Sequence, residues 1–266
     1  MTAPTRRPAR SVVERAATQF ADTWVVLPTY NEAANLTEIS VAILKQLPGV
    51  KLLVVDDGSP DGTGRLADEL AAADEQVRVL HRARKEGIGP AYVAGFRVAL
   101  DEGARRVVQM DADWSHHPRY LDRLLAALDE ADLVIGSRYV AAGGVRNWGA
   151  WRRFVSRGGS LFARTVLGLT PHDLTGGFKA WRAETLAALP WQRLHSGGYV
   201  FQIETTFLAS RAGARVTEVP IVFEDRLVGV SKMSRRIIVE ALVVVVRLRL
   251  EELWARLRRR RLRSRG

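Results

Sequence analysis

Two aspartates separated by one small residue are the side chains in this chain best suited to hold a metal ion. Asp111 and Asp113 flank Ala112 at the end of Val107–Met110, an apolar run that we interpret as a strand. Two carboxylates on such a turn can reach one divalent cation, which neutralises a diphosphate and improves it as a leaving group. Taken alone, the pair is better explained as a turn or as the cap of a helix beginning near Pro118.

The chain contains no cysteine, so a metal ion would need oxygen or imidazole ligands. This favours a hard cation such as Mg²⁺ or Mn²⁺. His116 and His117 follow the two aspartates and could act as ligands or bases. Because they directly precede Pro118, we expect them to shape the loop instead.

Two further strand ends carry polar groups that support a ligand site. Pro28, Tyr30 and Glu32 follow an apolar run, and Asp56 and Asp57 follow another. Each group also has a plain explanation as a turn. The carboxyl ends of parallel strands meet at one rim of a sheet, where open α/β proteins bind their ligands. We therefore expect Asp56 and Asp57 to face the same crevice as Asp111 and to contact a base or ribose.

The elements that would position these groups alternate along the first half of the chain. Apolar runs typical of strands cover Trp24–Leu27, Leu52–Val55, Val77–Leu80, Val107–Met110 and Leu133–Ile135. Helical spacing covers Glu32–Gln46, Asp61–Ala73, Gly89–Glu102 and Pro118–Asp129. This alternation predicts an α/β protein with a Rossmann-like, mostly parallel sheet and helices on both faces.

After Gly143 the alternation stops. A segment rich in Trp and Arg (147–156) is followed by glycine-rich turns at 175–177 and 196–198 and by a last strand near Val216–Phe223. No Pro/Ser-rich linker or internal repeat divides the chain. We interpret this half as built onto the same sheet, and expect a basic N-terminus (1–22), one catalytic domain (23–234) and a basic amphipathic helix with its tail (235–266).

The formal charge of +11 is concentrated at the two ends of the chain. Three arginines lie in the first ten residues, and eleven arginines against three glutamates lie after Ser234, so the body is neutral. The body therefore does not predict a nucleic-acid-binding surface. The first ten residues lack the apolar stretch of a signal peptide, and Ile237–Val246 is too short to cross a bilayer, so we expect a cytoplasmic location. The C-terminal composition suits a helix on an anionic membrane, or a core-packed helix with a basic tail.

Seven strings in the chain resemble one enzyme family. They are LPTYNE, VVDDGSPDGT, MDADWSHHP, GSRY, DLTGGFKAW, SGGYVFQIE and DRLVGVSKMS. From about Trp24 to Ser234 the chain resembles the family-2 glycosyltransferases of the dolichol- or polyprenol-phosphate mannose synthase group. The resemblance implies a GT-A fold, GDP-mannose as donor, a polyprenyl phosphate as acceptor, a divalent cation, and inverting transfer. It also implies peripheral attachment to the cytoplasmic face of a membrane, through lipid or a membrane-protein partner.

The resemblance also implies roles for individual residues. The guanosine would be held by Pro28, Tyr30, Glu32, Val55 and Asp57. Asp111, Ala112 and Asp113 would bind the diphosphate and the metal. Ser115 would be a weak metal ligand, and water would complete the coordination shell of the metal. The donor phosphates would be bound by Arg138, Arg226 and Lys232. Arg152 and Ser156 would bind the acceptor phosphate through charge-assisted bonds, and Asp113, Arg138 and Arg152 would form the catalytic set.

Two other functions remain open at this stage. The same fold serves enzymes that transfer glucose or N-acetylglucosamine from a UDP-sugar to a polyprenyl phosphate, and the spacing of motifs does not resolve the donor. A nucleic-acid-binding protein that uses the basic ends is a remote alternative, and it makes no use of the strand-end motifs.

Overall fold

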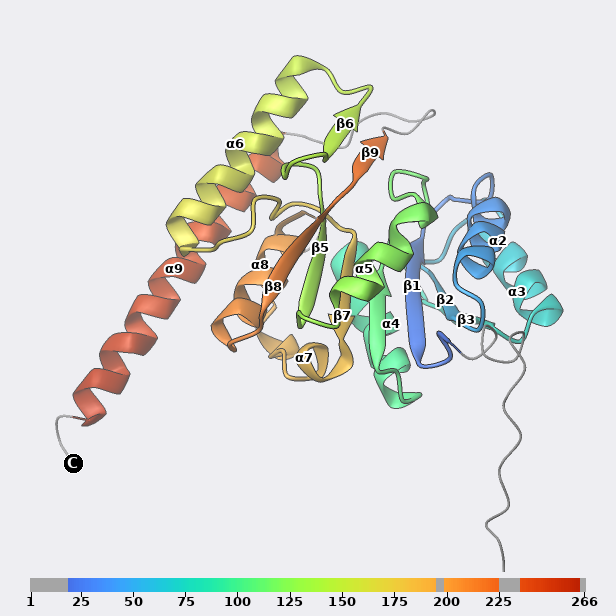
Figure 1. Cartoon of the computed structure of the whole chain (residues 1–266), viewed down its shortest axis with the longest axis horizontal. Coiled ribbons are helices and arrows are strands. Elements are labelled where there is room, and N and C mark those ends of the chain that lie inside the picture. Colours follow the sequence, from blue (N-terminus) through green and yellow to red (C-terminus); the bar gives the residue numbers. More distant parts are fainter. Residues whose placement is uncertain (1–18, 195–198, 225–234, 264–266) are drawn as a thin grey trace, which may run out of the picture.

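One sheet of seven strands forms the centre of the structure, a computed structural model that describes residues 19–194, 199–224 and 235–263 (Figure 1). Its strands follow the order β3-β2-β1-β4-β7-β5-β8. The strands are β1 (Thr23–Thr29), β2 (Lys51–Asp56), β3 (Val77–His81), β4 (Arg106–Gln109), β5 (Leu133–Ser137), β7 (Lys179–Arg182) and β8 (Val216–Pro220). The chain reverses its order between β1 and β4, which is where sheets of this type bind ligands.

The mostly parallel sheet predicted from the sequence is confirmed. Strands β1 to β4 are parallel neighbours, and β5 pairs in parallel with β8. The exception is β7, which lies between β4 and β5 and is antiparallel to both. Sequence reasoning missed β7 because its four residues begin with a lysine and end with an arginine, yet Lys179 is fully buried.

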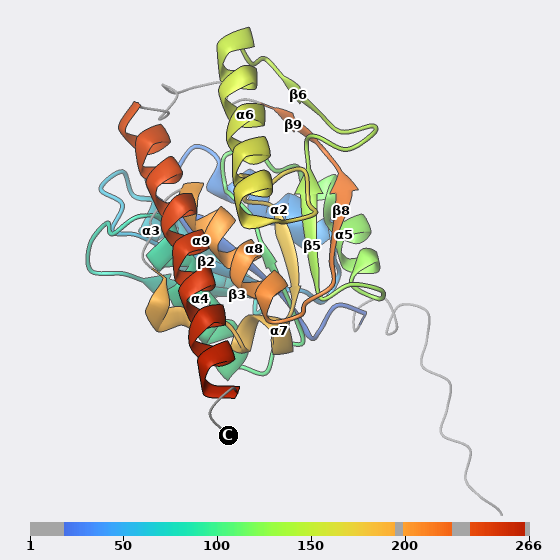
Figure 2. The same cartoon turned by 90° about the vertical axis from the view of Figure 1, so that its left-hand side faces the viewer.

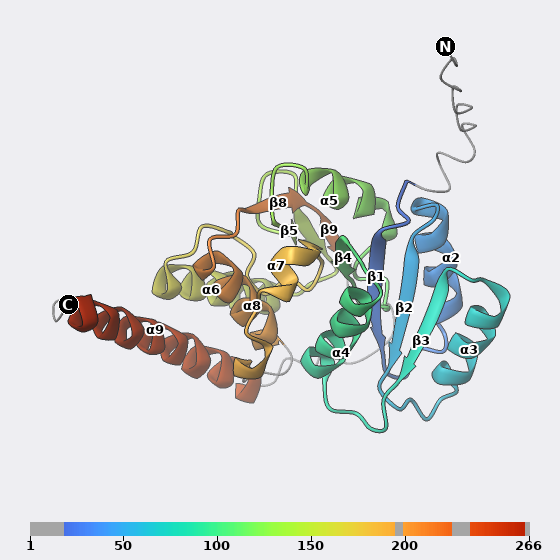
Figure 3. The same cartoon turned by 90° about the horizontal axis from the view of Figure 1, so that it is seen from below.

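Helices cover both faces of the sheet, as predicted. On one face lie α2 (Leu36–Gln46), α3 (Thr63–Ala73) and, after the short helix η1 (Pro118–Tyr120), α5 (Leu121–Ala127). On the other lie α4 (Ile88–Asp101), α7 (Ala183–Ala187) and α8 (Tyr199–Arg211). Figure 3 shows α2 and α3 on one side of β1 to β3 and α4 on the other. A further short helix, η2 (Trp191–Arg193), follows α7.

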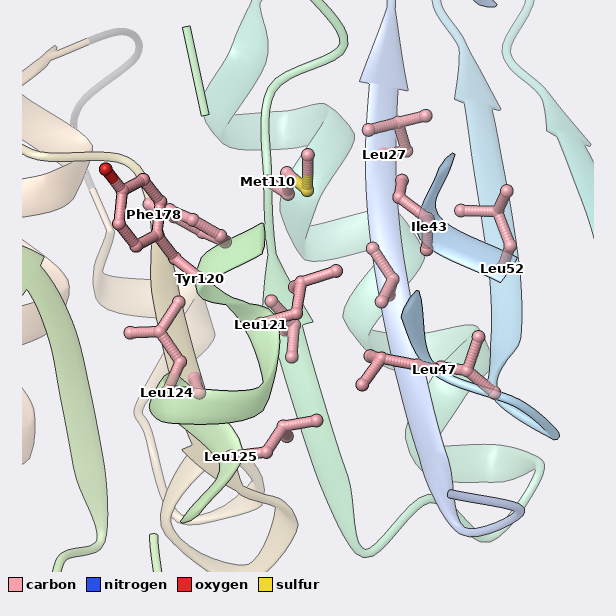
Figure 4. Close-up of a cluster of buried hydrophobic side chains, with 14 of the residues drawn as sticks. Leu27, Ile43, Leu47, Leu52, Met110, Tyr120, Leu121, Leu124, Leu125 and Phe178 are labelled. Carbon is pink, nitrogen blue, oxygen red and sulfur yellow. The ribbon is translucent and has the colours of Figure 1, made fainter. Parts of the chain in front are cut away.

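The core between the sheet and α2 consists of large aliphatic side chains. In Figure 4, Leu27 and Leu52 of the sheet point toward Ile43 and Leu47, and all four are fully buried. On the opposite face, α4 approaches the strands closely at Gly95. A Cβ atom there would lie 2.4 Å from Val26 Cγ1, so no larger residue fits. This close packing fixes the helix that carries Tyr92 toward the rim of the sheet.

A separate two-stranded sheet and two long helices lie next to the β5–β8 side of the central sheet. Strands β6 (Gly144–Arg146) and β9 (Val222–Glu224) form a small parallel pair, and β6 leads into α6 (Ala150–Leu167). Helix α9 (Arg235–Arg263) packs against α6 and α8 through an apolar cluster that includes Val245 and Leu248. Figures 2 and 3 show α6 and α9 side by side at the end of the molecule opposite α3.

The helix expected in the C-terminal region is therefore present, and part of it packs against the core. Among the residues that the structure describes, no helix combines the length and the apolar character needed to span a bilayer.

Candidate active site

Four strands carry their polar residues to one rim of the sheet. Tyr30 follows β1, Asp57 follows β2, Asp111 follows β4 and Arg138 follows β5. All four strands point the same way, so these residues lie at their shared carboxyl edge. The shared carboxyl edge expected of parallel strands is therefore present, while a common ligand site for these side chains stays a prediction.

Asp111 is held by two aromatic side chains, Tyr92 at its carboxylate and His116 at its backbone. The Tyr92 hydroxyl donates to Asp111 Oδ1 at 2.7 Å. The Asp111 backbone N–H donates to His116 Nδ1 at 3.0 Å, and His116 stacks on Phe178 with ring centroids 5.0 Å apart. One quarter of the Asp111 side chain is exposed. The carboxylate is therefore oriented by its partners and still reaches solvent.

The pKa values of the two supporting groups keep both uncharged at pH 7. Burial lowers the pKa of His116 below its ordinary value, although the Asp111 and Asp113 charges oppose this. Burial raises the pKa of Tyr92 well above its ordinary value, and the Asp111 charge adds to it. A neutral His116 that accepts at Nδ1 carries its proton on Nε2, so it orients Asp111 and is not positioned as a base. The expectation that His116 shapes the loop agrees with this geometry.

Asp113 is oriented by its own turn. Its Oδ1 accepts from the Ser115 backbone N–H at 3.1 Å and from the Ser115 hydroxyl. Trp114 between them has a φ of +62°, a left-handed conformation within the turn that brings Ser115 back to Asp113. Ser115 thus orients Asp113, while its assignment as a metal ligand stays a prediction.

The two aspartates fit a hard divalent cation by chemistry. They offer carboxylate oxygens at a partly open strand end, with a neutral tyrosine and histidine behind them. Within the described ranges, no three His, Asp or Glu side chains gather into a group that could hold a metal ion by itself. A cation here would therefore need further oxygen ligands, which a diphosphate supplies.

The rim on the β1–β2 side is formed by a loop tied to Asp57. Asp57 pairs with Arg82 and accepts from the backbone N–H groups of Glu86 and Gly87 at 3.1 and 3.3 Å. Lys85 from this loop lies 3.5 Å from the centroid of the half-buried Tyr30 ring. Asp57 thus holds the loop in place and Lys85 lies over the Tyr30 ring, while the binding of a base by Tyr30 and Asp57 stays a prediction.

The other residues predicted for the guanosine and the diphosphate differ in accessibility. Pro28 and Glu32 are half-buried, and Glu32 accepts from Asn35 Nδ2 at 2.8 Å. Val55 and Ala112 are buried, so they can meet a ligand only through the backbone. Asp56 accepts from the Ser59 backbone N–H at 3.2 Å and thereby closes its own turn.

Arg138 forms a buried ion pair that sequence reasoning missed. Its Nε and Nη2 atoms donate to the two Asp173 oxygens at 2.7 and 2.6 Å, and its backbone N–H donates to Asp173 at 2.9 Å. Arg138 Nη2 also donates to the Thr175 hydroxyl at 2.8 Å. Burial raises the pKa of Asp173, but the Arg138 charge and these bonds outweigh it and hold that pKa below the ordinary value. The DLTGGFKAW string contains Asp173, and this was the only signal for it.

The residues predicted for the acceptor lie on α6 and near it. The Tyr139 hydroxyl donates to the buried Ser156 Oγ at 2.6 Å, which ties the first half of α6 to the end of β5. Arg152 is half-buried and its guanidinium lies 4.2 Å from the Trp148 ring centroid. The structure therefore brings Arg152 and Ser156 to the Arg138 side of the rim. Arg226 and Lys232 lie outside the described residues.

Comparison with known proteins places these features in context. Residues 24–189 match the model of Glycosyl transferase family 2. An undecaprenyl-phosphate mannosyltransferase of Micrococcus luteus is 48% identical over 235 residues, covering 88% of this chain and 97% of that protein. A polyprenol monophosphomannose synthase of Mycolicibacterium smegmatis is 51% identical over 226 residues, covering 84% and 85%.

Solved structures share the fold at lower identity. Glucosyl-3-phosphoglycerate synthase from Mycobacterium tuberculosis, with Mn²⁺, UDP and glucosyl-3-phosphoglycerate, is 22% identical with a TM-score of 0.61, covering 92% of this chain and 86% of that one. A mannosyltransferase from Pyrobaculum calidifontis with GDP-Man and Mn²⁺ is 19% identical with a TM-score of 0.53, covering 78% and 57%.

Proposed function

Since the chain belongs to glycosyl transferase family 2, we propose that it transfers mannose from GDP-mannose to a polyprenyl phosphate, giving polyprenyl-phosphate mannose and GDP. The chain is a glycosyltransferase with a GT-A fold. The proposal depends mainly on one observation: the chain combines an acidic rim, Asp111 and Asp113, with helix α6, which carries Arg152. The chain is also about half identical to two enzymes named for this reaction.

A phosphate acceptor would not require a general base from the protein. An alcohol acceptor would need a base to remove its proton. A phosphate monoester has a second pKa near 6, by analogy with phosphorylated side chains, so it is largely dianionic at pH 7. Its oxygen can attack the anomeric carbon directly while the bond to the GDP oxygen breaks, and this single displacement inverts the anomeric centre. The protein then has to align two anionic substrates and offset their repulsion.

The described residues divide that work between them. Asp111 and Asp113 would hold a divalent cation, which supplies charge to stabilise the departing diphosphate. Mn²⁺ in structures that share the fold supports a divalent cation. Arg138 would interact with the donor phosphates, while Arg152 and Ser156 would bind the acceptor phosphate. The Tyr30 ring and Asp57 would receive the guanine.

The exposed faces of α6 and α9 support attachment to a membrane surface. On α6, Trp151, Phe154 and Leu161 are 73%, 68% and 62% exposed, while the side that faces the protein carries small buried residues. On α9, a row of apolar residues with three- or four-residue spacing is at least 40% exposed: Val239, Val243, Val246, Leu250, Leu253, Trp254 and Leu257.

Arginines flank this row on α9, among them Arg247, Arg249 and Arg256. Their long stems can lie along apolar surface while their charges meet lipid phosphates. Such a helix lies in the plane of a membrane interface, where each basic residue contributes about 1 kcal/mol on an anionic leaflet. This location would bring α6, and with it Arg152, close to a lipid-linked phosphate.

The transfer reaction can be tested with three labelled donors. Purified protein with Mg²⁺ or Mn²⁺ and a polyprenyl phosphate is given GDP-mannose, UDP-glucose or UDP-N-acetylglucosamine, and the label in an organic extract is counted. We expect label from GDP-mannose alone. Label from a UDP-sugar only would replace the proposal with its closest alternative, and label from none would reject it.

The membrane surface has its own test. Sedimentation with vesicles that contain anionic lipid should bring down the wild-type protein, and replacing Trp254 and Leu257 by serine should reduce the bound fraction. Equal binding to vesicles of neutral lipid would contradict a role for the flanking arginines. Unchanged binding by the serine variant would contradict a role for the apolar row.

A further inference from the structure

Trp148 occupies the junction between the donor and acceptor sides of the rim. It lies between β6 and the first residue of α6, and only 5% of its surface is exposed. Asn147 before it has a φ of +60°, in the left-handed region that few residues other than glycine adopt. The Trp148 carbonyl accepts from Arg153 Nε at 2.9 Å. The backbone is therefore held from both sides in the conformation that buries this ring.

Two arginines with different predicted substrates lie against the one Trp148 ring. The Arg138 guanidinium carbon is 5.4 Å from the ring centroid, and that of Arg152 is 4.2 Å from it. Both are within the range of about 6 Å in which a cation is attracted by the face of an aromatic ring. Like charges repel, so a ring that attracts both cations makes their close approach easier.

The ring is also connected to the acidic rim. Phe223 of β9 meets Trp148 edge-on with centroids 5.4 Å apart, and it meets His116 edge-on at 5.7 Å. His116 in turn accepts from the Asp111 backbone. Aromatic contacts from Trp148 through Phe223 to His116, and one hydrogen bond from the Asp111 backbone, thus link the two arginines to the Asp111 turn.

The Trp148 indole N–H is buried and has no hydrogen-bond partner in the described part of the chain. The same holds for Trp181 Nε1, so this property alone does not indicate a ligand. The two tryptophans differ in their surroundings. Trp181, a residue of β7, lies in the apolar core with Lys179 Nζ 5.7 Å from its ring centroid, whereas Trp148 lies beside two guanidinium groups at the rim. A phosphate oxygen drawn to those guanidinium groups would be a suitable acceptor for the Trp148 N–H.

We propose that Trp148 is a positioning residue that holds the donor-side Arg138 and the acceptor-side Arg152 against one ring, and that its indole N–H donates to a phosphate oxygen of a bound substrate. The proposal rests on the proposed function, because that function gives the two arginines their separate substrates. It assigns the spacing between donor diphosphate and acceptor phosphate to one residue of the Trp- and Arg-rich segment 147–156, for which the sequence predicted no role.

Two substitutions separate the two parts of the proposal. Trp148→Phe keeps an aromatic face for the arginines and removes the N–H, so the KM for one substrate should rise about tenfold while the other stays within twofold. Trp148→Leu removes the face as well, so the KM values for both GDP-mannose and the acceptor should rise and kcat should fall. Trp181→Phe is the matched control, since it makes the same change at a buried tryptophan away from the rim. It should lower the Tm without moving either KM.

The tryptophan side-chain N–H signals provide a readout that does not need catalysis. In ¹⁵N-labelled protein, the Trp148 signal is assigned by its loss in Trp148→Phe. Titration with farnesyl phosphate, and separately with GDP and Mg²⁺, should shift that signal and leave the Trp181 signal unchanged. If Trp148→Leu does not fold, Trp148→Phe and this titration still test the N–H contact.

The outcomes distinguish this inference from the function on which it rests. If the wild-type protein transfers no sugar from any donor, the proposed function fails, and a shifted Trp148 signal would still identify a phosphate contact. If the wild-type protein transfers mannose, but the signal does not move and Trp148→Phe matches it in both KM values, the N–H contact is overturned. Folded Trp148→Leu protein with a change in only one KM, or in neither, would overturn the coupling of the two arginines.

Discussion

Replacing Asp173 with asparagine should destabilise the protein strongly, because it leaves a buried arginine without its counter-charge. Asp173 is fully buried and receives three N–H groups from Arg138, two from the side chain and one from the backbone. An asparagine keeps one acceptor oxygen and turns an NH₂ group toward donors that it cannot bond. The substitution preserves volume, so packing changes little.

The size of the effect follows from the burial of the pair. Removing one partner of a buried ion pair costs about 3–5 kcal/mol, since the remaining charge is no longer compensated. For a domain of this size, each kcal/mol corresponds to roughly 2–4 °C in Tm, so we expect a decrease on the order of 10 °C. Glu69→Gln is the control, because Glu69 pairs with Arg65 at 2.6 Å on the exposed surface of α3, where such a pair contributes about 0–1 kcal/mol.

Thermal unfolding followed by circular dichroism measures both variants. The pH dependence supplies a second check. Because the folded pKa of Asp173 lies below the ordinary value of 3.8, its stabilising contribution is complete above about pH 4 and is lost as the pH falls through the folded value. The asparagine variant should lack that part of the acid sensitivity. A decrease in Tm of less than about 2 °C for Asp173→Asn, or a decrease no larger than that of Glu69→Gln, would refute the reasoning.

Three further predictions concern buried groups near the rim. Burial lowers the pKa of Lys179 to about 7, so the unfolded chain binds more protons above that pH and stability should rise with pH by up to about 1.4 kcal/mol per unit. Urea unfolding of Lys179→Met should show a flatter dependence between pH 7 and 10, and parallel curves would contradict the assignment. Asp113→Ala should lower metal-dependent transfer by more than about 100-fold with an unchanged Tm, and near-full activity in the labelled-donor assay would reject its role. Gly177→Ala would place a Cβ atom 3.2 Å from His116 and 3.5 Å from Asp111 Oδ2. Overpacking of this kind costs about 1–3 kcal/mol of stability. Because the added atom also crowds Asp111, we expect kcat to fall even at temperatures where the variant stays folded. Stopped-flow or steady-state rates at a temperature well below the Tm test this, and unchanged kcat would mean that the loop adjusts.

Several parts of the site were predictable because they depend on residues adjacent in sequence. Apolar runs of three or four residues predicted β1 to β5, and those of β1, β2, β4 and β5 are followed by the polar residues at the rim. The turn that orients Asp113 is likewise local, since Ser115 is two residues away. Such features follow from backbone geometry over a few residues, which the order of side-chain types records directly.

Long-range pairing decided the rest. The Arg138–Asp173 ion pair joins residues 35 positions apart, and the Tyr92–Asp111 hydrogen bond joins residues 19 apart. Lys179 could not be predicted in a central strand for the same reason, because a lysine normally argues against one. Its three hydrogen-bond acceptors come from α8, which is distant in sequence: the Gln202 carbonyl and the hydroxyls of Thr205 and Thr206.

By itself, the sequence determined which residues stand at the strand ends and that the ends of the chain carry the excess positive charge. The tertiary structure decided which of those residues are buried, which partner each one has, and that Trp148 lies against two arginines. Burial and pairing depend on the packing of elements that are distant in the chain. The cost of a buried charge or an unpaired donor is set by those neighbours, and no local pattern contains them.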